Sequence, residues 1–255
     1  MIPVMLLVIV LVFTINYFSA GDPVVQILGA EATQEQIELK RAELGLDQPY
    51  YVQLFSYIKN IITKFDFGHS YKTGEPVIQE VLKRTPITLM LTICSMTIAT
   101  VIGITLGIVS AVKQYSAFDY IATFCSLVGA SMPSFWLGLM LMLVFSLNLG
   151  WFPSSGFSSF KAMILPAIAV STIPISTITR TTRSAMLEVI RQDYMRTARA
   201  KGLSEYVIVL KHGLKNAMIP VVTILGIQLG RTMGGSIVTE SIFSIPGLGS
   251  LLVTS

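Results

Sequence analysis

The sequence predicts an all-α, polytopic membrane protein. Of its 255 residues, 53% are hydrophobic and only 13% are charged, a balance that soluble domains of this size rarely show. The apolar residues come in runs of about 20, the length at which a helix crosses roughly 30 Å of hydrocarbon. Backbone polar groups in lipid have to be satisfied within their own segment, so we expect these runs to be helices.

The first predicted transmembrane helix occupies residues 1–20. Its apolar run, Ile2 to Ala20, has no charge and is followed by Gly21-Asp22-Pro23. A cleaved signal peptide is the alternative, but the basic n-region and the A-x-A cleavage pattern are both missing. Four further apolar runs make five spans in all: residues 87–112, 120–149, 162–178 and 217–239. Leu251, Leu252 and Val253 resemble the start of another apolar helix, so a sixth span is expected beyond residue 255.

Residues 21–86 are predicted to form a small helical cap outside the cytoplasm. Thr33 and Gln36 have the spacing of a capping box, which would open a short helix that Gly45 closes. A second stretch places apolar side chains on one helical face, as in a helix that lies on the membrane surface: Val52, Phe55, Ile58 and Ile62.

The orientation follows from the loop expected at residues 179–216, within a permease core at residues 87–255. Eight basic residues oppose three acidic residues in this loop, which places it in the cytoplasm. By alternation, the N-terminus is cytoplasmic and the cap is outside. Because topology explains most of the net charge of +4, no nucleic-acid partner is expected.

The stretch from Asp193 to Leu203 within this loop is predicted to be a short exposed helix. It combines good helix formers with small side chains and ends at Gly202. Thr197, Ala198 and Ala200 would let the surface of another protein approach the backbone closely. Spacing alone leaves an alternative open, a solvated basic loop that has no partner.

The same stretch resembles the EAA loop of ABC-importer permeases, in the form found in the dipeptide, oligopeptide and nickel permease family. Thr197 and Ala198 occupy the two alanine positions, Arg196 replaces the Glu of the motif, and Gly202 is its glycine. Further stretches match the family in order along nearly the whole chain: residues 21–23, 45–49, 66–70, 73–77, 131–136 and 240–249.

This resemblance implies a type I ABC importer transmembrane fold in a bacterial or archaeal cytoplasmic (inner) membrane. It also implies a cytoplasmic coupling helix that contacts a separate ATPase, with these coupling residues: Asp193, Arg196, Thr197, Ala198 and Gly202. The implied partners are a second homologous permease, two ATPase subunits, an extracytoplasmic substrate-binding protein and membrane lipid.

No enzymatic activity is expected of this chain. The sequence lacks the G-x-x-x-x-G-K-[ST] motif that cradles phosphates, so ATP and Mg²⁺ are expected on the partner ATPase subunits. His69, His212, Cys94 and Cys125 lack the spacing of metal ligands. We therefore expect no cofactor and no metal site in this chain.

Polar residues and a proline at membrane depth are the candidates for the translocation path or its gate: Ser131, Pro133, Gln228, Arg231 and Glu240. A charge near the centre of a spanning helix costs about 2.5 to 3.5 kcal/mol on insertion scales, so Arg231 is expected to face the pore. Snorkelling, or pairing with Glu240, is the alternative. Glu240 is interpreted as an outer gate or a contact with the binding protein, against the alternative of a solvated acid at a helix end.

Three glycines at every fourth position of the last run, Gly226, Gly230 and Gly234, predict close helix packing. Gly103 and Gly107 repeat this spacing in the second run. A face of this kind suits helices that pack closely and slide past one another.

The predicted function is that of a permease subunit forming half of the translocation path for short peptides. The same fold importing nickel or a metal chelate is an alternative. A secondary transporter driven by an ion gradient belongs to another class and is disfavoured, since the spans hold no acidic residue apart from Asp119 at a boundary. An intramembrane enzyme is ranked last, because no H-E-x-x-H motif is present.

Overall fold

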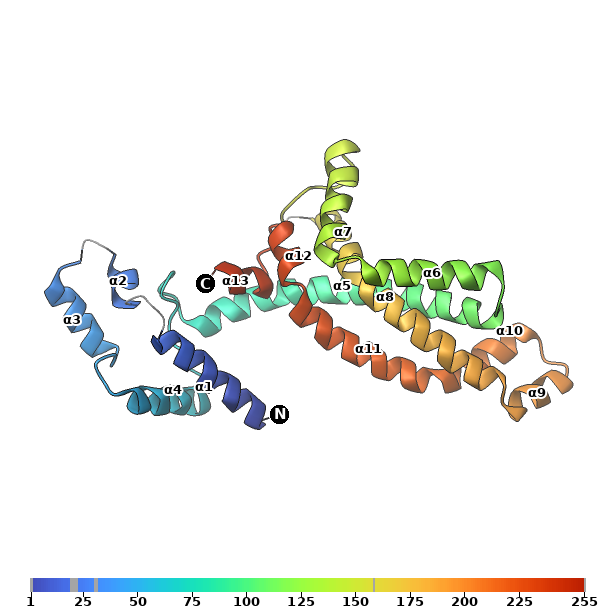
Figure 1. Ribbon diagram of the computed structural model, residues 1–255, viewed down its shortest axis with the longest axis horizontal. Coiled ribbons are helices and arrows are strands. Elements are labelled where there is room, and N and C mark those ends of the chain that lie inside the picture. Colours follow the sequence, from blue (N-terminus) through green and yellow to red (C-terminus); the bar gives the residue numbers. More distant parts are fainter. Residues whose placement is uncertain (1, 19–22, 30–31, 158, 255) are drawn as a thin grey trace. The chain divides into compact units, whose positions relative to one another are not determined.

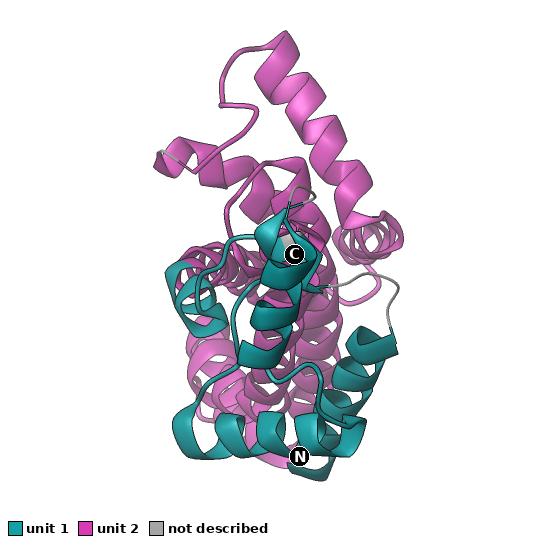
Figure 2. Ribbon diagram, turned by 90° about the vertical axis from the view of Figure 1, so that its left-hand side faces the viewer, with its two compact units in different colours: residues 1–83, 255 teal, residues 84–254 magenta. Residues whose placement is uncertain are grey.

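The computed structural model describes all residues except 1, 19–22, 30–31, 158 and 255. The described residues are helical, apart from turns and one isolated bridge between His69 and Pro76, which confirms the all-α prediction. They form two compact units, residues 1–83 and residues 84–254 (Figure 2). The end of the first predicted span and most of the Gly21-Asp22-Pro23 motif lie outside the described residues.

The described residues of the first unit form these helices before α5 begins: α1 (Ile2–Phe18), α2 (Pro23–Leu28), α3 (Gln34–Glu43) and α4 (Tyr50–Lys64). The predicted capping box is present, because the Thr33 side chain accepts from the Gln36 N–H and the Gln36 side chain accepts from the Thr33 N–H. Gly45 follows α3 with φ +67°, the left-handed conformation that favours glycine. Helix α1 contacts α4 through a hydrogen bond of 2.7 Å between the Thr14 and Tyr50 hydroxyls.

Long helices dominate the second unit, in which α5, α8 and α11 run alongside one another (Figure 1). Its elements in chain order are α5 (Val77–Val112, which starts in the first unit), α6 (Ala117–Ser131), α7 (Ser134–Leu141), the π-helical η1 (Met142–Asn148), α8 (Phe160–Ile190), α9 (Asp193–Ala200), α10 (Glu205–Val207), the π-helical η2 (Ile208–Leu214), α11 (Lys215–Gly235), α12 (Ile237–Ile242) and α13 (Leu248–Thr254).

The long helices account for the four predicted runs after residue 86. Among the described residues, the helical stretches 77–112, 160–190 and 205–235 are each long and apolar enough to cross a membrane, and the bent pair 117–131 and 134–148 makes a fourth if it counts as one span. The first run forms α1, an apolar helix of 17 residues.

The run expected as one helix over residues 120–149 is broken. Helices α6 and α7 meet at an angle of 100° across Met132 and Pro133. Met132 is extended, with φ −81° and ψ 127°, because a residue before proline avoids the α-helical region. The Ser131–Pro133 motif is therefore a bend between two helical arms.

The loop expected at residues 179–216 is mostly helical. Helix α8 continues past the predicted span to Ile190, and η2 leads without a break into α11. The basic and acidic residues that end an apolar window are themselves good helix formers, so hydropathy underestimates the length of α8. The run at 217–239 also divides, because α11 ends at Gly235 and α12 follows Ser236.

Two glycines bring α5 and α8 into close contact. A Cβ atom added to Gly103 would lie 2.8 Å from Cγ2 of Ile178, and one added to Gly107 would lie 2.5 Å from Cβ of Thr182. A side chain larger than hydrogen has no room at either position. Helix α8 contacts α6, α7 and α11 as well as α5, which makes it the central helix of the second unit.

The glycines of α11 are in a different environment. A Cβ atom added to Gly226, Gly230 or Gly234 would meet no described atom within 4 Å. The described residues leave this face open, so its role in helix packing stays a prediction.

The contrast between the two sets of glycines predicts opposite effects of one methyl group. We expect Gly107→Ala to lower the thermal stability of the purified protein in detergent, because overpacking typically costs about 1–3 kcal/mol. Gly230→Ala should leave the melting temperature unchanged or raise it, since Ala is the better helix former. Equal melting temperatures for the two variants would contradict the close approach of α5 and α8.

Candidate functional site

Helix α9 is anchored by its own inner face at one end of the second unit (Figure 1). The side chains of Met195 and Ala198 are buried and pack with Ile208, Val189 and Ile190. These partners belong to the last turn of α8 and to η2. Helix α9 is therefore packed against both the end of α8 and η2.

The other face of α9 is exposed. The side chains of Asp193 and Arg196 are 99% and 78% exposed, with 3.9 Å between Oδ1 and Nη1, and Thr197 is also exposed. Gly202 ends this segment at φ +75°, as the predicted glycine stop requires. Ala198 lies on the inner face, which corrects the expectation that its small side chain belongs to the surface that a partner approaches.

Two side-chain contacts fix the segment that follows α9. Arg199 donates from Nε to Oε1 of Glu205 at 2.8 Å, and this hydrogen bond raises the pKa of Arg199. Asn216 donates from Nδ2 to the Tyr194 hydroxyl at 3.0 Å. Because both contacts are exposed, they orient the segment more than they stabilise it.

An ion pair between a buried aspartate and a partly exposed arginine joins three helices at this same end of the unit. Arg183 donates from Nε and Nη2 to the two carboxylate oxygens of Asp119, each at 2.7 Å. Asp119 also accepts from the Ser110 hydroxyl and from the Tyr115 N–H, and only 1% of its surface is exposed. The carboxylate of α6 thus ties α5 to α8. In the sequence, the indication of this ion pair is the single acidic residue Asp119 at the edge of an apolar run.

A second buried carboxylate lies at the opposite end of the unit. Oε1 of Glu240 accepts from the hydroxyls of Thr88 at 2.8 Å and Ser236 at 2.9 Å. Oε2 accepts from the N–H groups of Gly249 at 2.7 Å and Ser250 at 3.2 Å. Glu240 is fully buried, so it is not a solvated acid at a helix end. Its carboxylate holds α12, α13 and α5 together.

The Pro-Gly segment around this carboxylate requires glycine at two positions. A Cβ atom added to Gly247 would overlap the Glu240 carboxylate, and one added to Gly249 would overlap the backbone of Ile237. The Thr88 hydroxyl also accepts from the Leu248 N–H at 2.8 Å. The close fit explains why this turn is rich in glycine.

The other candidates for the path are dispersed. Ser131 and Pro133 are exposed at the bend between α6 and α7, Gln228 is buried in α11 with Oε1 unpaired, and Arg231 is exposed on α11. Among the described residues, no ion pair joins Arg231 to Glu240, so the proposed pairing is absent from this structure.

Comparison with known families matches both parts of the chain. Residues 103–255 match the family described as binding-protein-dependent transport system inner membrane component. Residues 1–92 match the N-terminal family of the same transport system membrane components. Together the two matches cover nearly all of the chain.

The relatives are permease proteins. The glutathione transport system permease protein GsiC of Salmonella typhi is 47% identical over 255 residues, which cover 100% of this chain and 83% of that protein. The dipeptide transport system permease protein DppB of Alkalihalophilus pseudofirmus (strain ATCC BAA-2126 / JCM 17055 / OF4) is 42% identical over 277 residues, which cover 98% of this chain and 83% of that protein.

Solved structures show the same fold. The MetNI methionine ABC transporter in an inward-facing conformation matches with a TM-score of 0.60 at 22% identity, covering 71% of this chain and 82% of that chain. An amino acid ABC transporter matches with a TM-score of 0.54 at 14% identity, covering 69% and 78%. The matched part of this chain thus has the fold seen in these two transporter structures.

The ion pair predicts a strong coupling between Asp119 and Arg183. Removing one partner of a fully buried pair typically costs about 3–5 kcal/mol. Because Arg183 is partly exposed, Asp119→Leu and Arg183→Met should each destabilise the protein by less than this. The double variant should be more stable than the two single effects predict, and a double-mutant cycle of unfolding in detergent measures the difference. Additive effects would mean that the pair does not act as a unit.

Substitution of Glu240 tests the hydrogen bonds at the opposite end of the second unit. Glu240→Ala removes the acceptor of two hydroxyls and two N–H groups, and each buried group left unpaired costs about 1–3 kcal/mol. We expect faster amide hydrogen exchange over residues 244–254, measured by mass spectrometry. Thr239→Val is the matched control, because the buried Thr239 hydroxyl has no hydrogen-bond partner among the described residues. Equal exchange in the two variants would contradict the role of the carboxylate.

Proposed function

This chain belongs to the family of binding-protein-dependent transport system inner membrane components, and on that premise we propose that it forms half of a path for short peptides. It is a permease subunit of an ABC importer and is embedded in the membrane. The observation that carries the peptide assignment is the identity of 42–47% across almost the whole chain to permeases named for glutathione and for dipeptides.

The energy source in this proposal is a pair of ATPase subunits that bind ATP and Mg²⁺. Helix α9 supports this arrangement, because its inner face is anchored on α8 while Asp193, Arg196 and Thr197 remain exposed. An exposed polar face on a rigidly held short helix suits docking into another protein. The coupling surface therefore comprises these three residues, with Gly202 as the stop that sets the length of the helix.

The α9 end of the second unit is the cytoplasmic end in this proposal. The excess of basic residues around α9 supports this orientation. The N-terminus is then also cytoplasmic, and residues 21–86 and the segment held by Glu240 face the side from which a binding protein delivers substrate. The second permease lies against the open glycine face of α11, and Ser131, Pro133, Gln228 and Arg231 are proposed to line or gate the path.

Co-purification from membranes of the host, in a mild detergent, tests the coupling surface. The unsubstituted chain should retain an ATPase subunit, which Arg196→Glu and Gly202→Val should deplete, the first by reversing a charge on the exposed face and the second by placing a β-branched residue at a left-handed position. Lys161→Glu reverses an exposed charge at the start of α8, the end of that helix opposite to α9, and serves as the control.

Two outcomes would count against the proposal in different ways. If no ATPase subunit accompanies the unsubstituted chain while other membrane complexes stay intact, the proposed ATPase partnership is wrong. If the subunit accompanies the parent and all three variants alike, the partnership stands and the coupling surface lies elsewhere.

A further inference from the structure

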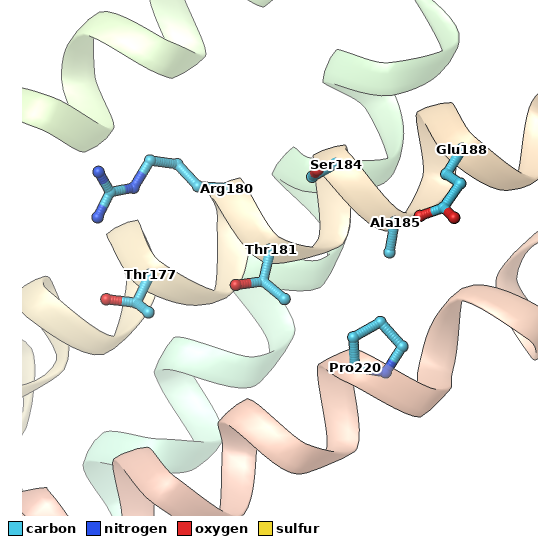
Figure 3. Close-up of a pocket in the computed structure, with 7 residues that line it drawn as sticks. All are labelled: Thr177, Arg180, Thr181, Ser184, Ala185, Glu188 and Pro220. Atoms are coloured by element: carbon cyan, nitrogen blue, oxygen red, sulfur yellow. The ribbon is translucent and has the colours of Figure 1, made fainter.

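A cavity of about 480 Å³ lies along the seam between α8 and α11, in the half of α8 that leads to α9. Figure 3 shows the residues of α8 in two neighbouring rows, with Pro220 facing them from α11. One row carries Arg180, Ser184 and Glu188, and the other carries Thr177, Thr181 and Ala185. The cavity is an open groove, lined by one side of α8 and by a single residue of α11.

Opposite charges mark the two ends of this cavity. Arg180 and Glu188 are both exposed, and among the described residues neither takes part in an ion pair. They are eight residues apart on one helix, a rise of about 12 Å. Hydroxyl groups lie between them, on Thr181 and Ser184.

A neighbouring arginine of the same helix has its charge neutralised by an ion pair. Arg183, three residues from Arg180, is bound by both carboxylate oxygens of Asp119. Arg180 has no such partner and also lines a second cavity beside that pair. Since charged residues in spanning helices face partners or water-filled paths, an exposed and unpaired guanidinium at this position is suited to bind an anionic group that enters from solution.

We propose that this cavity is a bipolar subsite for the transported peptide, in which Arg180 binds the terminal carboxylate and Glu188 binds the terminal ammonium group. An extended residue spans about 3.3–3.6 Å, so a tripeptide is close in length to the helical rise between the backbones of Arg180 and Glu188. The Thr and Ser hydroxyls between them bind the peptide backbone without selecting a side chain. This inference rests on the proposed function and locates a peptide subsite within it.

Protection of a cysteine in the cavity tests the subsite on the complete transporter in detergent. Ser184→Cys places a thiol between the two charges, and mass spectrometry of the peptide that contains residue 184 follows its reaction with a maleimide. The probes are trialanine, its C-terminal amide and its N-acetyl form. Trialanine should protect the thiol, and each capped form should protect about tenfold more weakly, because each lacks one charge-assisted hydrogen bond.

Further substitutions in the Ser184→Cys protein test which charged residue binds which terminus of the peptide. Arg180→Gln should abolish the preference for trialanine over its amide and keep the preference over the N-acetyl form, and Glu188→Gln should do the reverse. Arg180→Lys should retain part of the first preference. Lys161→Gln is the matched control, because Lys161 is an exposed basic residue of α8 outside the cavity, and it should change neither preference.

Uptake of trialanine into proteoliposomes, measured alongside, separates this inference from the proposed function. If the parent imports trialanine but the three probes protect Cys equally, or if Arg180→Gln keeps both preferences, the subsite is overturned and the peptide permease stands. If the parent imports no peptide from a panel of two to four residues in length, the peptide assignment itself fails and the subsite fails with it.

Discussion

The close approach of α5 and α8 at Gly103 and Gly107 is the contact on which the rest of residues 84–254 depends. It brings two backbones together where no side chain fits, and it sets the distance at which polar groups near the ends of α5 meet their partners. Thr88 reaches Glu240 at one end of α5, and Ser110 reaches Asp119 at the other. Apolar packing in the middle of the helix pair and paired carboxylates at its ends therefore support one another, as helices in lipid require.

Features that depend on a few adjacent residues could be predicted from the sequence. The capping box at Thr33 and the glycine stop at Gly202 form as expected, because each is decided within about one helical turn. The bend at Pro133 had a local signal too, in the restriction that proline places on Met132. The hydropathy pattern nevertheless predicts one continuous helix here, since the apolar residues continue on both sides of the bend.

Features that depend on a distant partner could not be predicted in the same way. Glu240 and Thr88 are 152 residues apart in the chain, and nothing near Glu240 in the sequence indicates that its carboxylate is buried. The glycine spacing has the same limit. Gly103 and Gly226 belong to the same kind of motif, yet the first is packed against α8 and the second faces no described atom, because a spacing identifies a face without identifying its neighbour.

The arrangement of fixed and open contacts indicates where motion can occur. Buried carboxylates bind α5 toward both of its ends. Asp119 connects α5 to α8, and Glu240 connects α5 to α12 and α13, so α5 and α8 are expected to move as one body. Helix α9 is fixed to the same body through Val189 and Ile190. The seam between α8 and α11 is packed with apolar side chains over much of its length, and the open groove beside Pro220 lies along it. Because α9 packs on η2 as well as on α8, and η2 continues into α11, a displacement of α9 is expected to move α8 and α11 together.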